Sequence, residues 1–145
     1  MRTHIAIATA ALLAGCAPTD DTTKAPAQGK AGSAIRIETP TGLGSGVYIG
    51  NDVIITAAHV VGNAPADIVD GKPTGLPVVT LRSDTGNAQR GEVLWVSKQY
   101  DIAAVRPADS RKFTEAALLC RAPVVGEPLT AAGNPFGLQF ITMHG

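Results

Sequence analysis

The chain has 145 residues, and roughly 115 of them remain for folding once the N-terminal segment is set aside, enough for one domain with a modest core. Twelve basic and twelve acidic side chains give a formal net charge of zero. There is no basic run that would indicate nucleic-acid binding, and no apolar stretch reaches the roughly 20 residues that span a bilayer. The 16 glycines, 10 prolines and 4% aromatic residues favour an all-β barrel or sandwich.

The N-terminus has the composition of an export signal. A short basic start is followed by an apolar run over residues 5–14, which is typical of a signal peptide. The run ends in Leu-Ala-Gly-Cys at Cys16, which resembles the lipobox of bacterial lipoproteins, where cleavage leaves an acylated cysteine at the new N-terminus. We expect residues 1–15 to be a lipoprotein signal peptide and Cys16 to carry a lipid anchor to the membrane. The alternative is an ordinary secretory signal with an incidental cysteine.

Residues 16–32 contain no large apolar side chain and cannot bury enough surface to offset the entropy lost on ordering, so we expect a flexible tether. The residue after the cysteine is Ala17. In the lipoprotein pattern an aspartate there favours the inner membrane, so the resemblance implies the bacterial cell envelope, at the outer membrane and facing the periplasm. With Cys16 lipidated, Cys120 lacks an intramolecular partner, and we expect a buried small hydrophobe rather than a nucleophile.

The rest of the chain divides into short segments with strand patterns. Residues 44–49 and 53–55 flank a tight Gly-Asn-Asp turn and predict a hairpin. Residues 63–77 are rich in proline and polar residues and are predicted to form a surface loop. The other predicted strands cover residues 34–38, 77–82, 88–97, 102–105 and part of 124–135. About six or seven short strands at regular spacing predict an all-β antiparallel barrel or sandwich.

The apolar strand at residues 53–55 is followed by Thr-Ala-Ala-His, ending at His59. A histidine at the end of a rigid element is held in place, as a catalytic base must be, although an isolated histidine there usually has no role. The order Thr-Ala-Ala-His after an apolar strand resembles the histidine motif of chymotrypsin-like serine peptidases. The glycine-rich segment 42–47 before it and Val60-Val61 after it are similar to the HtrA/Deg branch of that family.

A second motif places Asp101 directly before an apolar strand, in Tyr-Asp-Ile-Ala-Ala-Val. Alone, an aspartate there usually caps a turn. The motif resembles the Asp-Ile-Ala-Val/Leu segment that supplies the carboxylate in the same family, with one alanine added. A hydroxyl nucleophile needs a base, histidine titrates near neutrality, and a carboxylate fixes the tautomer of the imidazole. The resemblance therefore implies His59 as the general base and Asp101 as the carboxylate that orients it.

A third match, at residues 132–138, resembles the Gly-Asn-Pro-Phe-Gly turn that opens the second barrel of HtrA-like peptidases. It implies that residues 33–132 form the first barrel of a trypsin-like double β-barrel and that residues 133–145 begin a truncated second barrel. Family members carry the catalytic serine downstream, in Gly-Asn/Asp-Ser-Gly-Gly. No serine follows Ser110, so the nucleophile is unknown, and the oxyanion hole and specificity pocket would lie in the missing part.

The predicted function is a serine endopeptidase that hydrolyses peptide bonds with a His-Asp-Ser triad, present here as an N-terminal fragment that is inactive alone. Protein or peptide substrates are expected and no cofactor; assembly into a homo-oligomer is left open. The alternative is an inactive one-barrel envelope lipoprotein that binds a partner or has a structural role, which would expose an apolar face. A metal site formed by His59, Asp101 and His144 is disfavoured because no ligand pair has helix or turn spacing.

Overall fold

The computed structural model describes residues 33–117, 121–122, 124–135, 138 and 140–145. The predicted signal peptide, the tether, Cys16 and Cys120 lie outside the described residues. The strands are β1 (Ala34–Thr39), β2 (Gly42–Tyr48), β3 (Ile54–Thr56), β4 (Ala66–Val69), β5 (Lys72–Arg82), β6 (Ala88–Ser97), β7 (Ile102–Pro107), β8 (Thr130–Gly133) and β9 (Ile141–His144). A one-turn helix α1 (Ala58–Val61) and a 3-10 turn η2 (Ser110–Lys112) complete the elements.

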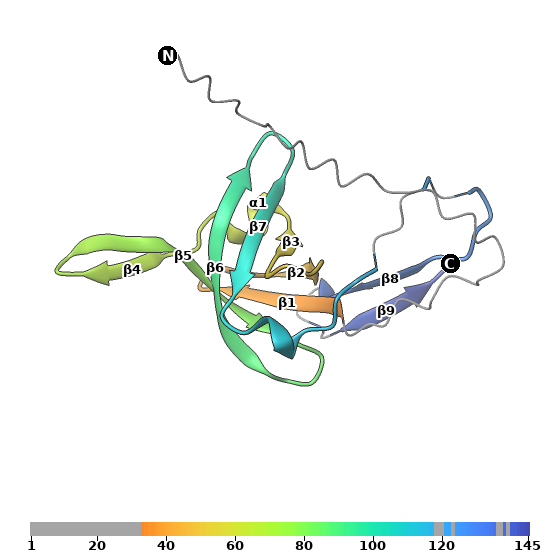
Figure 1. Ribbon diagram of the computed structural model, residues 1–145. Coiled ribbons are helices and arrows are strands. Elements are labelled where there is room, and N and C mark those ends of the chain that lie inside the picture. The colour runs from red at the N-terminus through yellow and green to blue at the C-terminus, as the bar shows by residue number, and fades with distance from the viewer. Residues whose placement is uncertain (1–32, 118–120, 123, 136–137, 139) are drawn as a thin grey trace, which may run out of the picture.

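Six of the strands close into an antiparallel barrel (Figure 1). The order around it is β1-β2-β3-β7-β6-β5, and β1 pairs with β5 to close the ring, with Ile37 opposite Leu81. Strand β4 adds a seventh strand beyond the end of the barrel by pairing with β5. The predicted antiparallel barrel of six to seven strands is therefore confirmed.

The hairpin predicted before the histidine motif is present as β2 and β3, with Val47 opposite Ile55. The connecting turn has positive φ at three successive residues, Gly50 (87°), Asn51 (50°) and Asp52 (59°). Glycine adopts this region without steric cost, and asparagine and aspartate tolerate it better than other residues. The Gly-Asn-Asp sequence thus fixes both the tightness of the turn and the register of the two strands.

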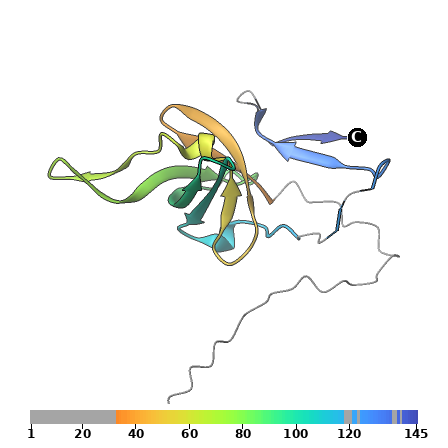
Figure 2. The same cartoon turned by 90° about the horizontal axis from the view of Figure 1, so that it is seen from above.

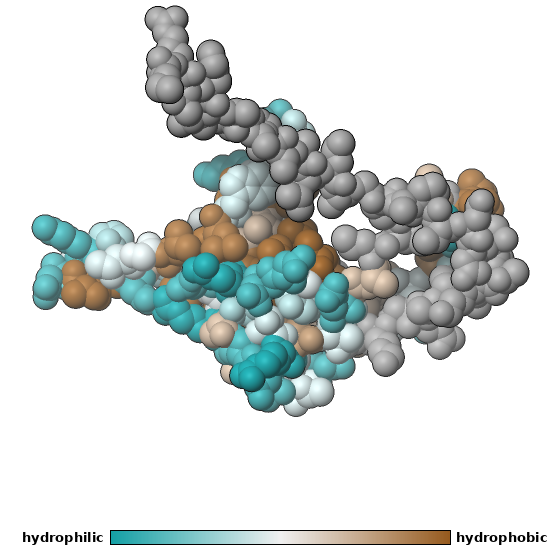
Figure 3. All heavy atoms as spheres, viewed as in Figure 1, coloured by the Kyte–Doolittle hydropathy of each residue, from teal (hydrophilic) through white to brown (hydrophobic). Residues whose placement is uncertain are grey.

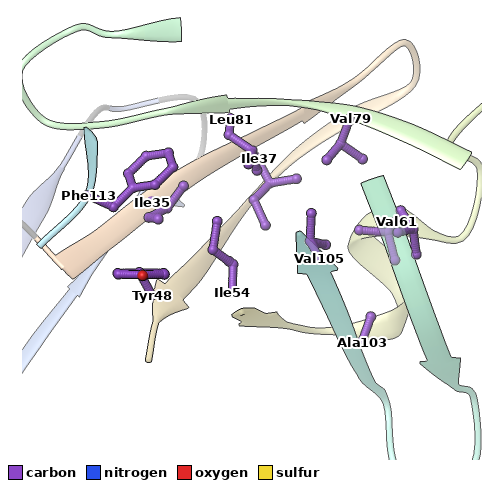
Figure 4. Packing of buried hydrophobic residues seen from close by; sticks show 11 residues of the cluster. Ile35, Ile37, Tyr48, Ile54, Val61, Val79, Leu81, Ala103, Val105 and Phe113 are labelled. Carbon is purple, nitrogen blue, oxygen red and sulfur yellow. The ribbon is translucent and has the colours of Figure 1, made fainter. Parts of the chain in front are cut away.

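The core fills the inside of the barrel, because β-branched and leucine side chains alternate inward along its strands (Figure 4). Complete burial of such a side chain contributes about 1.5–3 kcal/mol relative to leaving it exposed. Tyr48 and Phe113 close one end with ring centroids 6.1 Å apart. Among the described residues, the hydrophobic ones with no exposed surface are Ile35, Ile37, Ile54, Leu81, Ala103 and Val105.

The prediction of a surface loop for residues 63–77 is wrong, because this segment contains β4 and the first half of β5. Asp70 (φ 51°) and Gly71 (φ 73°) form the two-residue turn with positive φ that matches the twist of a hairpin. The prolines that suggested a loop, Pro73 and Pro77, lie where β5 has no partner on its second side, because its pairing with β6 begins at Val78. Proline is tolerated at such an edge.

The last two strands form a separate hairpin in which Thr130 lies opposite His144 and Gly133 opposite Ile141. The predicted division after residue 132 falls within β8. Figure 2 shows this hairpin beside the barrel, on the side away from the β4–β5 hairpin. No helix in the described part of the chain is long and apolar enough to cross a membrane.

The close packing of β2 against the core gives a test of the fold. A Cβ at Gly46 would lie 2.9 Å from side-chain carbons of Ile37 and Ile54 and 3.0 Å from the carbonyl oxygen of Ile55. We expect Gly46→Ala to lower the free energy of unfolding by about 1–3 kcal/mol, because overpacking displaces the neighbours. Urea denaturation followed by far-ultraviolet circular dichroism measures this.

Gly42→Ala in the same strand is the matched control, because a Cβ there has no neighbour nearer than the Thr39 hydroxyl at 3.9 Å. Its free energy of unfolding should change by about 0.5 kcal/mol or less. Equal stabilities for the two variants would contradict the packing described for β2.

Candidate active site

His59 lies in the one-turn helix α1 rather than at the end of a strand as predicted, since β3 ends at Thr56. The Thr56 hydroxyl donates to the carbonyl oxygen of Ser45 at 2.8 Å, which fixes the end of β3 to β2. Ala58 and Val61 are buried and anchor the helix, while His59 is exposed. The helix also rests closely on β2, where Gly44 leaves room for Val60. The histidine is therefore carried by a short element that is held on both sides.

Asp101 lies in the turn that precedes β7, with φ of 51°. Strands β3 and β7 are antiparallel neighbours, with Thr56 opposite Ala103. The residues just after β3 and just before β7 therefore lie at the same end of the barrel. This pairing brings His59 and Asp101 together although 42 positions separate them in the sequence.

The two side chains are in direct contact. Asp101 Oδ2 lies 2.7 Å from His59 Nδ1, and Oδ1 accepts a hydrogen bond from the backbone N–H of His59 at 2.9 Å. With both carboxylate oxygens engaged by one residue, the ring is held with Nδ1 toward Asp101. When Nδ1 carries the ring proton, Nε2 has a free lone pair and can accept a proton from another group. Nε2 makes no hydrogen bond to any residue that the structure describes.

The hydrogen bonds also set the charge of the carboxylate. The backbone N–H of His59, followed by its side chain, holds the pKa of Asp101 below the ordinary value, and the Ala58 backbone adds to this. Asp101 is therefore ionised at neutral pH. The side chains of His59 and Asp101 are 73% and 53% exposed, so water screens the pair and their attraction is weaker than it would be in a buried site.

A groove of about 510 Å³ opens beside His59. One wall consists of β2 and α1 and the other of the β8–β9 hairpin, so the groove runs between the barrel and the second sheet. Its apolar lining includes Leu43, Val60, Ala131, Ile141 and Met143. A mainly apolar groove next to a group that can accept a proton has the form expected of a binding site.

Asn134 attaches the second hairpin to the barrel. Its backbone N–H donates to the Ser45 hydroxyl at 2.8 Å, and its side-chain oxygen accepts from the backbone N–H of Phe140 at 2.9 Å. The side chain is almost fully buried. Sequence reasoning placed a turn here but missed the contact with Ser45, and the only available signal was an asparagine within a Gly-Asn-Pro turn.

His144 does not join this site. His144 lies on β9, with Nδ1 2.9 Å from the Thr130 hydroxyl oxygen. Within the described ranges no group of three or more histidine, cysteine, aspartate or glutamate side chains is arranged to hold a metal ion. Cys16 and Cys120 lie outside the described residues, so their predicted roles stay predictions.

Comparison with known proteins gives a family match and similar folds. Residues 44–145 match the family described as trypsin-like peptidase domain. No curated protein matches the chain. A serine endoprotease from Yersinia pestis is similar in structure, with a TM-score of 0.64 and 20% identity over 81% of this chain and 40% of that one. The inactive form of the Rv3671c protease has a TM-score of 0.64 and 18% identity over 78% of this chain and 50% of that one.

At such low sequence identity, these similarities establish the fold of this chain and nothing about its activity. This chain spans half or less of the length of the two solved chains.

The ionisation of Asp101 gives a test of the site. We expect its carboxyl to titrate below the ordinary aspartate value in the folded protein, measured by carbon-detected NMR. Because folding lowers this pKa, the ionised carboxylate stabilises the folded protein at any pH above the pKa of Asp101 in the unfolded chain. This stabilisation is lost as the pH falls through the lower pKa of the folded state. His59→Ala should raise the Asp101 pKa only part of the way, because the backbone N–H of residue 59, the largest cause, remains. A full return to the ordinary value would contradict this order of causes.

Proposed function

The chain belongs to the family of trypsin-like peptidase domains, and on that premise we propose that His59 and Asp101 are the base and the orienting carboxylate of a serine endopeptidase. The observation that carries the proposal is the 2.7 Å contact between His59 Nδ1 and Asp101 Oδ2. This is the geometry that a hydroxyl nucleophile requires of its base and of the group that orients it.

In the proposed mechanism, His59 Nε2 takes the proton of a serine hydroxyl as the oxygen attacks the carbonyl carbon of the scissile peptide bond. The imidazolium that forms is stabilised by the ionised Asp101. His59 then gives the proton to the leaving amine, and the acyl-enzyme is hydrolysed by water that His59 activates in the same way. The hydrogen bond from the backbone N–H of His59 to Asp101 keeps the carboxylate in position through both steps.

The proposal places the serine nucleophile and the oxyanion hole in residues that follow residue 145. No serine follows Ser110, and no serine in the chain stands in a Gly-Asn/Asp-Ser-Gly-Gly context. Coverage of only 40% and 50% of the similar solved chains supports a site completed by further chain. The groove between β2 and the β8–β9 hairpin would then hold a protein or peptide substrate.

We further assign the chain to the HtrA/Deg branch, supported by the glycine-rich segment 42–47 before the histidine motif and by the Gly-Asn-Pro-Phe-Gly turn at residues 133–137. In this proposal the enzyme is a lipoprotein of the bacterial cell envelope that faces the periplasm from the outer membrane. The Leu-Ala-Gly-Cys sequence ending at Cys16 supports this location. The substrates would be exported or misfolded envelope proteins.

The catalytic proposal is tested with the protein expressed from its complete gene. A fluorophosphonate probe should label a serine beyond residue 145, whereas the 145-residue chain alone should remain unlabelled. We expect His59→Ala to lower kcat for peptide hydrolysis about a millionfold and Asp101→Asn about ten-thousandfold, as in other serine peptidases.

Asp109→Asn is the matched control, because Asp109 is also an aspartate with a lowered pKa, caused by Arg111, and asparagine caps a helix equally well. It should leave kcat/KM unchanged. If the complete protein is folded but neither labelled nor active, the endopeptidase proposal fails and the alternative of an inactive binding or structural lipoprotein is favoured.

The lipid anchor is tested separately. Metabolic labelling with a radioactive fatty acid in a bacterial host should label the chain, and Cys16→Ala should abolish the label, because acyl chains attach to the thiol and amine of that residue. Cys120→Ala should leave the label intact. Labelling that persists in the Cys16→Ala variant would show that the N-terminus is not a lipoprotein signal.

A further inference from the structure

The second sheet, formed by β8 and β9, does not share the hydrophobic core of the barrel. Among the described residues, the buried core includes none from β8 or β9, and Figure 3 shows hydrophobic residues gathered over the barrel. Apolar side chains of the hairpin and its flank are exposed, with Leu129 at 60% and Met143 at 63%. Asn134, in contrast, is only 6% exposed. Apolar packing therefore contributes little to the position of this sheet.

The Ser45 hydroxyl is the point where the second sheet is attached to the barrel. Its oxygen accepts the backbone N–H of Asn134 at 2.8 Å, and the side-chain nitrogen of Asn134 donates to the same oxygen at 3.4 Å. Gly133 permits this close approach, because a Cβ there would lie 3.2 Å from the Ser45 oxygen. A hydrogen bond depends on distance and angle, whereas apolar contact has no preferred direction. The bond therefore fixes the spacing between β2 and β8.

The main chain of the same serine holds the segment that carries His59. The carbonyl oxygen of Ser45 accepts a hydrogen bond from the Thr56 hydroxyl at 2.8 Å. Thr56 is the last residue of β3, which leads into α1 and His59, and it lies opposite Gly46 in the pairing of β2 with β3. Ser45 thus contacts the histidine segment through its backbone and the second sheet through its side chain.

We infer that Ser45 is a positioning residue for the peptidase. Its hydroxyl sets the position of the second sheet, and of the chain that follows it, relative to His59. This inference rests on the proposed function, in which the serine nucleophile follows residue 145 and is reached through this sheet. Ser45 and Asn134 both line the groove beside His59, so the same bond sets the width of the groove. A displacement of about 1 Å between reacting groups can lower a rate about 100-fold.

The two connections of Ser45 can be separated by mutation. Ser45→Ala removes the hydroxyl but leaves the carbonyl oxygen that accepts from Thr56. Because Asn134 lines an open groove, water can accept its freed N–H. We therefore expect the barrel to stay folded while the second sheet becomes free to shift. The contact between His59 and Asp101 lies within the barrel and should be unchanged.

The attachment itself is tested in the 145-residue chain by amide hydrogen exchange. In Ser45→Ala the amide of Asn134 should exchange at least about tenfold faster than in the parent chain, because its acceptor is gone. The amide of Phe140 is an internal control, since it donates to Asn134 Oδ1 within the second sheet and should keep its rate. Equal rates for Asn134 in the two proteins would overturn the inference. Faster exchange at Phe140 would also overturn it, because the hairpin would then unfold rather than shift.

The positioning role is tested in the protein expressed from its complete gene. A fluorophosphonate probe should label Ser45→Ala about 10- to 100-fold more slowly than the parent but to the same final extent, whereas a loss of folded protein would lower the extent. The pH dependence of the labelling rate should keep its apparent pKa, because His59 keeps its contact with Asp101. Ser45→Thr keeps a hydroxyl on a residue that suits a strand and should restore the parent rate.

Ser110→Ala is the matched control, because it removes the same group from a residue of η2 that does not line the groove. It should be labelled at the parent rate. Labelling of Ser45→Ala as fast as the parent would overturn the inference alone, as would a shifted apparent pKa or a Ser45→Thr protein as slow as Ser45→Ala. A complete parent protein that is folded but not labelled would overturn the proposed function, and the positioning role with it.

Discussion

The antiparallel pairing of β3 with β7 is the constraint on which the site depends. With Ile54 opposite Val105 and Thr56 opposite Ala103, the residues that follow one strand and precede the other are carried to the same end of the barrel. Neither His59 nor Asp101 needs a long side chain to reach across. The 2.7 Å contact between them is therefore a consequence of strand order, and any change that shifts this register by one residue would separate the pair.

Small residues around this pairing allow the site to be assembled. Gly44 makes room for Val60, so α1 can rest directly on β2, and Gly46 lets the core isoleucines approach the strand from inside. The Ser45 hydroxyl lies between these glycines and accepts the backbone N–H of Asn134. The Gly-Leu-Gly-Ser-Gly segment thus supports the histidine helix on one side and fastens the β8–β9 hairpin on the other.

The two ends of the molecule differ in structure. At one end the barrel meets the second hairpin, and the groove between them lies beside an ionised carboxylate and an imidazole. At the other end the β4–β5 hairpin (residues 66–77) extends beyond the core, with Ile68 and Val69 exposed and β4 as the last strand of its sheet.

By itself, the sequence determined the antiparallel all-β class and the β2–β3 hairpin, through apolar alternation and a Gly-Asn-Asp turn. The choice of a barrel over a sandwich, and of His59 and Asp101 as the residues that meet, came from the resemblance of two short motifs to a known family. Only the tertiary structure decided that residues 66–77 form a hairpin. Proline suggests a loop in a sequence, but a strand that is paired along one edge only can accommodate it. The Ser45–Asn134 contact joins residues 89 positions apart, and no local pattern encodes a hydrogen bond that exists only once two sheets are packed together.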